Sequence, residues 1–334
     1  MNFPRVLVAI AFTSFGLFGP SRTLWANEPE KPREAKAITL TTLAVAQADA
    51  RTARSPGPSQ CRTEDVIYGH RDGMALTMDV FTPKGPKNGA GVIICVSAGY
   101  KSGRELLGLL HPNFTTPFLD RGYVVFAVMH SSQPKSTVPD IVEDVHRAVR
   151  FIKSNARQYG IEPSRLGITG GSAGGHLSLM MGCAGTAGDS NAKDPVDRAS
   201  SKVAAVACFF PPTDFLALDQ GDFKEFSAAF DFREMDSASG KLLPVSPAKR
   251  QQIGREISPL THAGKDSSPT FIIHGDNDKT VPISQSEALV AKLKDCGVEC
   301  HLVAKKGKGH LWFGIEKDVP SFADWFDRYL LGKK

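Results

Sequence analysis

The sequence predicts an α/β fold in which helices cover both faces of a mostly parallel sheet. From about residue 62 onward, short apolar runs typical of strands alternate with longer segments of helical periodicity. The runs at 91–96 and 123–129 are continuously apolar, which is typical of strands buried on both faces. The chain has 334 residues, of which 41% are hydrophobic and 22% charged, so it can bury the core of one large domain.

The N-terminal residues precede this pattern. Arg5 gives the chain a basic start, and residues 6–18 form an apolar run of the length found in secretory signals. The run is too short to span a bilayer, and an uncleaved N-terminal anchor is the alternative. We expect residues 1–26 to be a signal peptide, and the mature protein to be secreted or periplasmic without stable membrane insertion. Residues 27–61, rich in Pro, Ala, Lys, Arg and Thr, predict a flexible lead-in to a domain at 62–334.

Eight segments have the length and composition of strands, in chain order 65–70, 75–81, 91–96, 123–129, 165–169, 203–210, 270–274 and 299–304. The sequence Arg71-Asp72-Gly73 between the first two predicts a hairpin turn. Segments of helical length separate most of the later strands, so we expect those strands to run parallel.

Five segments predict helices, in chain order 106–119, 140–159, 173–182, 284–293 and 321–331. The second is the clearest, because apolar residues such as Ile141, Val145 and Val149 recur at spacings of three and four and Gly160 follows its end. Two prolines interrupt the first segment, so its helix is less regular.

The segment 211–269 interrupts the alternation after the sixth strand. It carries charged residues and five phenylalanines, namely Phe215, Phe223, Phe226, Phe230 and Phe232. An excursion of this length inside one domain is typical of a substrate-binding insertion, so we expect a lid-like element. Helices that simply pack on the flank of the sheet are the alternative.

The sequence Gly170-Gly171-Ser172-Ala173-Gly174 matches the G-x-S-x-G pattern of a nucleophile elbow. A serine at the tip of a strand-to-helix turn has a strained backbone, so the residues two positions away must be small. The helix that follows directs its free N–H groups toward an oxyanion. The pattern predicts that Ser172 is a nucleophile and that Ala173 donates to the oxyanion.

A serine nucleophile needs a base and a carboxylate that orients the base. His310 lies in a glycine-rich loop after the last strand, and Asp276 and Asp278 follow the seventh. The order Ser172, Asp278, His310 is the one expected on an α/β sheet, with each residue at the carboxyl end of a strand. Asp214, after the sixth strand, is an alternative acid. His301 falls within a strand and His176 within the helix behind the elbow, so both are expected to be structural.

From about residue 62 to its end the chain resembles the α/β-hydrolase superfamily. It is most similar to the branch of bacterial acetyl-hydrolases and acetylxylan and feruloyl esterases. The matching motifs are Gly170-Gly-Ser-Ala-Gly-Gly-His176, Pro211-Pro-Thr-Asp214, Ser258-Pro259, His274-Gly-Asp-Asn-Asp-Lys-Thr-Val-Pro282 and Gly307-Lys-Gly-His310. The resemblance implies that Asp278 is the acid and that Asp276 closes its turn. It also implies a secreted serine esterase that forms an acyl-enzyme on Ser172, with acetyl or feruloyl esters of polysaccharides as expected substrates.

The chain departs from this branch after the third strand. Where the branch has His-Gly-Gly-Gly-Trp-x-x-Gly, the chain has Val96-Ser-Ala-Gly-Tyr-Lys-Ser-Gly103. Backbone donors need no particular side chain, so we expect the N–H groups of Ala98 and Gly99 to join Ala173 in an oxyanion hole.

We expect an acyl or substrate pocket to be lined by Tyr100, Phe215 and Phe223. Two other interpretations remain. One is a serine exopeptidase of the prolyl-oligopeptidase type, and the other is a catalytically weak binding protein on the same fold, which the altered loop favours.

Several classes of function are not expected. The six cysteines lack zinc-like spacing with histidines, and no phosphate-binding loop or dinucleotide pattern is present, so we expect no metal and no cofactor. The formal net charge is +5 without a basic run, so we expect no nucleic-acid partner. Cys296 and Cys300 flank a helix-to-strand turn and could pair in an oxidising compartment.

Overall fold

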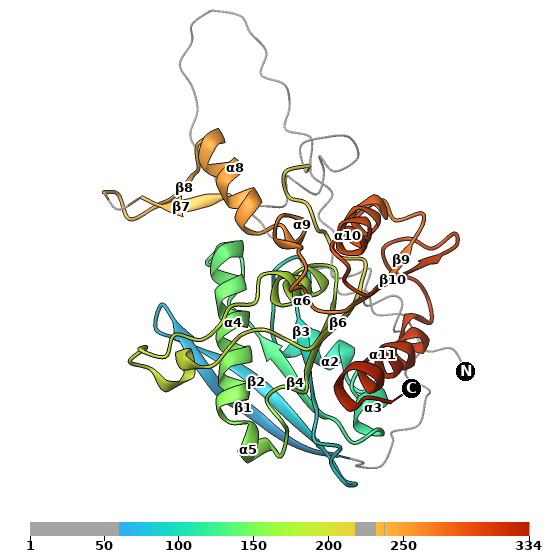
Figure 1. The fold of residues 1–334 in the computed structure, drawn as a ribbon. Coiled ribbons are helices and arrows are strands. Elements are labelled where there is room, and N and C mark those ends of the chain that lie inside the picture. Colours follow the sequence, from blue (N-terminus) through green and yellow to red (C-terminus); the bar gives the residue numbers. More distant parts are fainter. Residues whose placement is uncertain (1–59, 218–231, 237, 334) are drawn as a thin grey trace, which may run out of the picture. The chain divides into compact units, whose positions relative to one another are not determined.

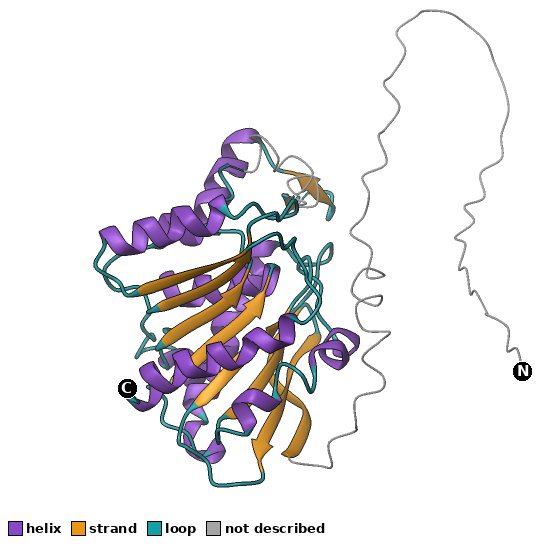
Figure 2. Ribbon diagram, turned by 90° about the vertical axis from the view of Figure 1, so that its right-hand side faces the viewer, coloured by secondary structure: helices purple, strands orange, loops and turns teal. Residues whose placement is uncertain are grey.

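The computed structural model describes residues 60–217, 232–236 and 238–333. The predicted signal peptide at 1–26, nearly all of the lead-in at 27–61, and Phe223 lie outside the described residues. The core element is an eight-stranded sheet with the order β1-β2-β4-β3-β5-β6-β9-β10 (Figures 1 and 2). Only β2 runs antiparallel to its neighbours, since β3, β4, β5, β6, β9 and β10 pair in parallel. The predicted mostly parallel sheet is therefore confirmed.

All eight predicted strands are present. Their bounds are β1 Gln60–Arg71, β2 Met74–Pro83, β3 Gly91–Val96, β4 Val124–Met129, β5 Leu166–Gly171, β6 Ala205–Phe209, β9 Thr270–Gly275 and β10 Cys300–Lys305. The strand β1 begins two residues before the expected domain start at residue 62. The reason is that Gln60 and Cys61 continue the hairpin ladder opposite Pro83 and Thr82.

Helices cover both faces of the sheet (Figures 1 and 2). On one face lie α4 (Val138–Ser154), α6 (Ala173–Cys183) and α10 (Ser284–Asp295). On the other lie α2 (Arg104–Leu110), α3 (Thr116–Leu119) and α11 (Val319–Leu331). Successive residues of a strand point to opposite faces, so β3 sends Ile93 and Cys95 into the first core and Ile94 and Val96 into the second.

The helix predicted at 140–159 is two helices in the structure. The first, α4, begins at a capping box in which Thr137 and Asp140 exchange side-chain and backbone hydrogen bonds. It ends before Asn155, whose side chain donates to the Phe151 carbonyl, and α5 (Ala156–Tyr159) follows. A side chain that bonds to the backbone competes with the helical ladder, which explains the break.

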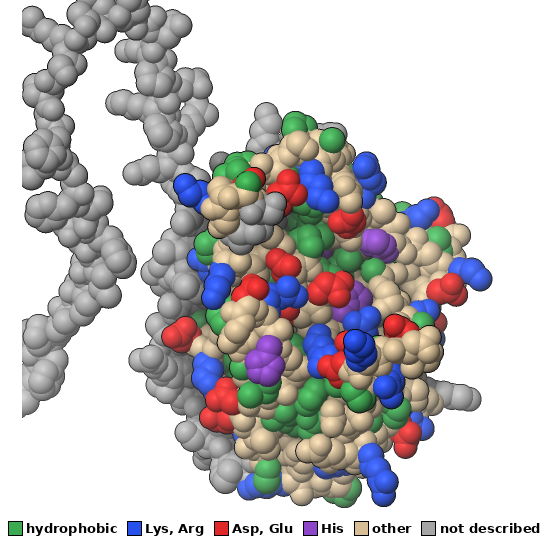
Figure 3. Space-filling view, turned by 90° about the vertical axis from the view of Figure 1, so that its left-hand side faces the viewer, with side chains coloured by type: hydrophobic (Ala, Val, Ile, Leu, Met, Phe, Trp, Pro, Cys, Tyr) green, Lys and Arg blue, Asp and Glu red, His purple; other side chains and the backbone are tan. Residues whose placement is uncertain are grey.

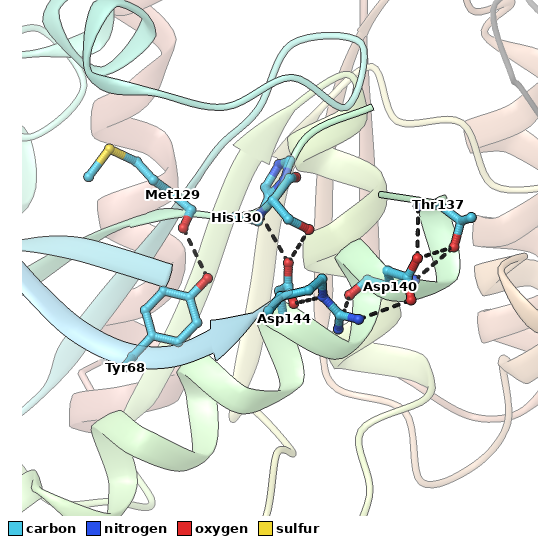
Figure 4. Close-up of polar contacts among 8 residues, drawn as sticks. Tyr68, Met129, His130, Thr137, Asp140 and Asp144 are labelled. Atoms are coloured by element: carbon cyan, nitrogen blue, oxygen red, sulfur yellow. Dashed lines mark hydrogen bonds and ion pairs between the residues drawn. The ribbon is translucent and has the colours of Figure 1, made fainter. Parts of the chain in front are cut away.

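A buried carboxylate joins α4 to the carboxyl end of β4. Asp144 accepts hydrogen bonds from the N–H and hydroxyl of Ser131 and from Arg71 Nε, at 2.7 Å (Figure 4). A buried charge is tolerated only when it is paired, so this network fixes the loop after β4. Beside it, the hydroxyl of Tyr68 on β1 donates to the Met129 carbonyl at 3.0 Å (Figure 4).

The described part of segment 211–269 contains a small two-stranded sheet, β7 (Arg233–Met235) and β8 (Leu242–Pro244), followed by α8 (Pro247–Glu256) and α9 (Pro259–His262). Ile253 and Ile257 are buried in the same core as α6. This portion therefore packs on the flank of the fold. A lid function for the segment stays a prediction.

The surface and the cysteines give further observations. Basic and acidic side chains lie interspersed on the face shown in Figure 3. All six cysteines are free thiols, including Cys296 and Cys300. Among the helices of the described residues, none combines the length and apolar character that crossing a bilayer requires.

Candidate active site

Ser172 lies at the sharp turn between β5 and α6. Its backbone has φ 54° and ψ −120°, a conformation that a residue with a side chain adopts only under strain. Its N–H donates to the Phe209 carbonyl at 3.0 Å, which ties the turn to the neighbouring strand β6. The side chain is thereby held at the carboxyl edge of the sheet.

Glycines flank Ser172 because the backbone passes too closely for any side chain. A Cβ at Gly170 would lie 2.6 Å from the backbone C and O atoms of Gly174. A Cβ at Gly174 would lie 2.6 Å from the carbonyl oxygen of Cys95 on β3. The glycine spacing seen in the sequence therefore has a steric cause.

The structure brings Ser172, His310 and Asp278 into one hydrogen-bonded chain. His310 Nε2 lies 2.9 Å from Ser172 Oγ, and His310 Nδ1 lies 2.7 Å from Asp278 Oδ2. The carboxylate can only accept, so Nδ1 carries the proton and Nε2 is free to accept the proton of the serine hydroxyl. The arrangement can remove a proton from Ser172.

Three hydrogen-bond donors contact the carboxylate of Asp278, and a second histidine lies close to it. Its Oδ1 accepts from the N–H groups of Thr280 at 2.8 Å and Val281 at 2.9 Å. Its Oδ2 faces His310 and also Nε2 of the buried His274, at 3.3 Å. Burial alone would raise the pKa of Asp278, but these hydrogen bonds and the charge interaction with His310 outweigh it and hold the pKa well below its ordinary value. Asp278 is therefore ionised throughout the neutral range.

The loops that carry Asp278 and His310 are braced against each other. A Cβ at Gly275 would lie 2.4 Å from the carbonyl oxygen of Lys308, so only glycine allows this approach. Asp276 accepts from the Gly307 N–H at 2.6 Å. The structure thus places Asp278 against the histidine, while Asp276 closes the adjoining turn.

Phe210 is a site residue that the sequence interpretation missed. Its ring lies 4.4 Å from the ring of His310, centroid to centroid, and Trp312 packs against Phe210 at 5.7 Å. The two aromatic rings support the imidazole. Only the position of Phe210 at the carboxyl end of the sixth strand could have indicated this role.

The loop after β3 differs from the expectation. The Ala98 N–H donates to the Lys101 carbonyl at 2.9 Å, and the Lys101 N–H donates back to Ala98 at 3.0 Å. The assignment of Ala98 as an oxyanion donor is therefore wrong, because its N–H is already used. Within the described part of the chain the N–H groups of Gly99 and Ala173 donate no hydrogen bond to a loop or neighbouring strand, and the first N–H groups of a helix have no partner inside it. These two groups remain as candidate donors.

The chain also matches a known protein family. Residues 78–293, well over half of the chain, match the model of the BD-FAE family. The chain belongs to the BD-FAE family.

The chain is similar to a probable carboxylic ester hydrolase, LipM, of Mycobacterium tuberculosis, with 28% identity over 73% of this chain and 56% of LipM. It thus spans little more than half the length of that relative. Among solved structures it is similar to a truncated carbohydrate esterase from gut microbiota, with a TM-score of 0.66, 24% identity, and coverage of 83% of this chain and 100% of that one. An acetyl ester-xyloside bifunctional hydrolase from Caldicellulosiruptor lactoaceticus gives a TM-score of 0.66, 19% identity, and coverage of 81% and 98%. The predicted α/β-hydrolase fold is confirmed.

The side chains expected to line a pocket lie in the packing around His176. Tyr100 and Phe215 are only 1% and 4% exposed, and their ring centroids lie 5.6 and 4.7 Å from that of His176. They offer almost no surface to a substrate, so their assignment as open pocket lining is wrong in this structure. Phe223 lies outside the described residues.

The competing histidine and acid positions also have structural partners. Asp214 accepts from the Leu216 N–H at 2.9 Å in its own loop, and its own N–H donates to Gln285. His301 lies in β10 with an exposed side chain, beside Phe271. Neither side chain is bonded to Ser172 or His310. Among the described residues, no group of three or more His, Cys, Asp or Glu side chains is arranged to hold a metal ion.

Proposed function

We propose that the chain is a serine esterase that hydrolyses carboxylic esters through an acyl-enzyme on Ser172. The observation that carries this proposal is the hydrogen-bonded chain from Asp278 through His310 to Ser172, at a strained elbow on the carboxyl edge of the sheet. The similarity to a probable carboxylic ester hydrolase supports it.

In the first step, His310 Nε2 takes the hydroxyl proton while Ser172 Oγ attacks the ester carbonyl carbon. The positive charge that develops on the imidazole faces the ionised Asp278, 2.7 Å away. The negative charge that develops on the carbonyl oxygen faces the N–H groups of Ala173 and Gly99. A single lost oxyanion donor lowers kcat by about 10²–10³-fold in serine hydrolases, so each of these two groups should contribute strongly to kcat.

In the second step, the tetrahedral intermediate collapses and the bond to the alcohol oxygen breaks. His310 returns its proton to that oxygen, which leaves as the free alcohol, and the acyl group stays on Ser172. Water then attacks the acyl-enzyme while His310 accepts a proton from it. A second collapse releases the carboxylic acid and restores the Ser172 hydroxyl.

Acetyl or feruloyl esters of polysaccharides are the proposed substrates. Two solved structures with the same fold support this choice. One is a carbohydrate esterase, and the other is an acetyl ester-xyloside bifunctional hydrolase. The apolar run at 6–18 supports a proposed signal peptide at 1–26 and a secreted or periplasmic location, where such polymers are met. Residues 62–334 would then form the catalytic domain, with segment 211–269 as its lid-like insertion.

Turnover of p-nitrophenyl acetate and release of acetate from acetylated xylan test the proposal. We expect the wild-type protein to hydrolyse both, and Ser172→Ala to be inactive because it lacks the nucleophile. Ser178→Ala is a suitable control, since this buried serine lies on the same helix and its hydroxyl donates to the Gly174 carbonyl rather than to Ser172 or His310. Equal activity of wild type and Ser172→Ala would contradict the proposed acyl-enzyme.

A further inference from the structure

The turn that presents Gly99 has an unusual backbone. Residues Ala98 and Lys101 exchange two hydrogen bonds, and the two residues between them have φ of 54° for Gly99 and 60° for Tyr100. A two-residue turn with two positive φ angles is the type I′ form, which favours glycine and asparagine. Tyr100 adopts this conformation at an energetic cost, so other contacts must hold it there.

The side chain of Tyr100 supplies such a contact. It is buried, and its hydroxyl lies 2.9 Å from Nδ1 of His176. On the other side of the ring, His176 Nε2 lies 2.7 Å from the carbonyl oxygen of Ile257. A carbonyl can only accept, so Nε2 carries the proton and Nδ1 accepts from the Tyr100 hydroxyl. Burial lowers the pKa of His176 to about 4, which keeps this neutral form at neutral pH.

His176 belongs to the first turn of the helix that follows the nucleophile. Its N–H donates to the carbonyl of Ser172 at 2.9 Å. The bond between Tyr100 and His176 therefore ties the Gly99 turn to the same helical turn that positions Ser172 and the Ala173 N–H. A second contact that holds Tyr100 is the Gln133 N–H, which donates to the Tyr100 carbonyl at 3.1 Å.

We propose that Tyr100 is a positioning residue for the oxyanion hole, with His176 as its anchor. The inference rests on the proposed esterase function. The Ala98 N–H already donates to the Lys101 carbonyl within the turn. The Gly99 N–H is therefore the donor that this loop offers to the oxyanion, together with the Ala173 N–H. An oxyanion donor acts only at the correct distance from the developing charge, so a turn held under strain needs a fixed anchor.

Tyr100→Phe tests the proposal, because it removes the hydroxyl and keeps the ring. We expect kcat for p-nitrophenyl acetate to fall about tenfold with KM unchanged, since the affected interaction forms in the transition state. The shape of the pH profile should stay the same, because Asp278 and His310 are untouched. The matched control is Tyr68→Phe, which removes an equally buried hydroxyl that donates to the Met129 carbonyl (Figure 4). We expect its kcat to stay within twofold of wild type.

A second variant, His176→Leu, removes the anchor instead of the hydroxyl. The double variant Tyr100→Phe/His176→Leu should have the kcat of His176→Leu alone, since both changes break one link. The inference is overturned if Tyr100→Phe loses no more kcat than Tyr68→Phe, or if it raises KM with kcat unchanged. A wild-type protein without activity toward any ester would instead contradict the proposed function, and this inference with it.

Discussion

The two halves of the candidate active site are built differently. On the acid–base side, Asp278 and His310 occupy loops in close backbone contact, and both carboxylate oxygens of Asp278 accept hydrogen bonds. On the oxyanion side, the turn after β3 holds Tyr100 at positive φ and uses the Ala98 N–H within itself. Proton transfer is thus fixed by direct contacts, while oxyanion binding depends on an anchor one residue away from the donor.

The unsatisfied polar groups show the same contrast. The side-chain oxygen of Ser97, just before the turn, is buried and has no hydrogen-bond partner among the described residues. The carboxylate of Asp278, by contrast, accepts hydrogen bonds on both of its oxygens. The oxyanion side therefore carries an unpaired buried polar group, whereas the side chains of Asp278 and His310 are both hydrogen-bonded.

The largest expected effect is on the acid–base side. Asp278→Asn should lower kcat about 10⁴-fold, because the amide no longer holds the His310 tautomer that accepts the serine proton. The control is Asp276→Asn, which alters only the brace to the Gly307 N–H and should cost less than tenfold. Steady-state kinetics with p-nitrophenyl acetate measures both. Similar losses of kcat in the two variants would contradict the assignment of Asp278 as the residue that orients His310.

The elbow between the two halves should show the next largest effect. Gly170→Ala would place a Cβ 2.6 Å from the backbone of Gly174, so α6 must shift and kcat should fall about 10²-fold. Gly171→Ala is the matched control, since its Cβ would meet the Phe210 ring at 3.4 Å, an ordinary contact. Unchanged activity of Gly170→Ala would refute the steric account of the glycine spacing.

Stability should depend on pH through Asp278. Its pKa lies below the unfolded value of about 3.9, so its stabilisation is complete above that pH and is lost as the pH falls toward the native pKa. At pH 7, Asp278→Asn should unfold with a free energy about 2 kcal/mol lower than wild type, from lost hydrogen bonds to a charged group. Urea unfolding of wild type and Asp278→Asn at pH 7 and pH 3 measures this gap between their free energies of unfolding. A gap that does not narrow at pH 3 would contradict the assignment.

The smallest expected effect lies beside the oxyanion turn. Ser97→Ala should leave the free energy of unfolding unchanged or raise it by up to about 1 kcal/mol, because it removes a buried hydroxyl without a partner. Ser131→Ala is the contrasting variant, since it removes a hydroxyl that donates to the buried Asp144 and should be destabilising. Thermal unfolding of both variants measures the two changes in stability. A larger loss of stability for Ser97→Ala than for Ser131→Ala would contradict this expectation.

The sequence predicted the features that follow from apolar patterning and from position at the ends of parallel strands, and it missed those that depend on individual hydrogen bonds. The strands follow from continuous apolar runs, and the approach of Asp278 and His310 follows from their place at the ends of parallel strands. The Ala98 assignment failed because a two-residue turn is fixed by its own hydrogen bonds, which apolar patterning does not encode. Tyr100 is aromatic and close to the site, yet its hydroxyl bonds to His176, which lies 76 positions later in the chain. Hydrogen-bond partners so far apart in the chain cannot be predicted from the spacing of residues in the sequence.

Covalent labelling tests the central claim most directly. A fluorophosphonate reacts only with a serine that is activated by a base and has an oxyanion site, so it examines both halves of the site together. Peptide mapping by mass spectrometry after labelling of the folded protein should find the adduct on Ser172, and Asp278→Asn should be labelled far more slowly. The absence of an adduct on Ser172 in the folded protein would contradict the account and would favour a binding protein built on the hydrolase fold.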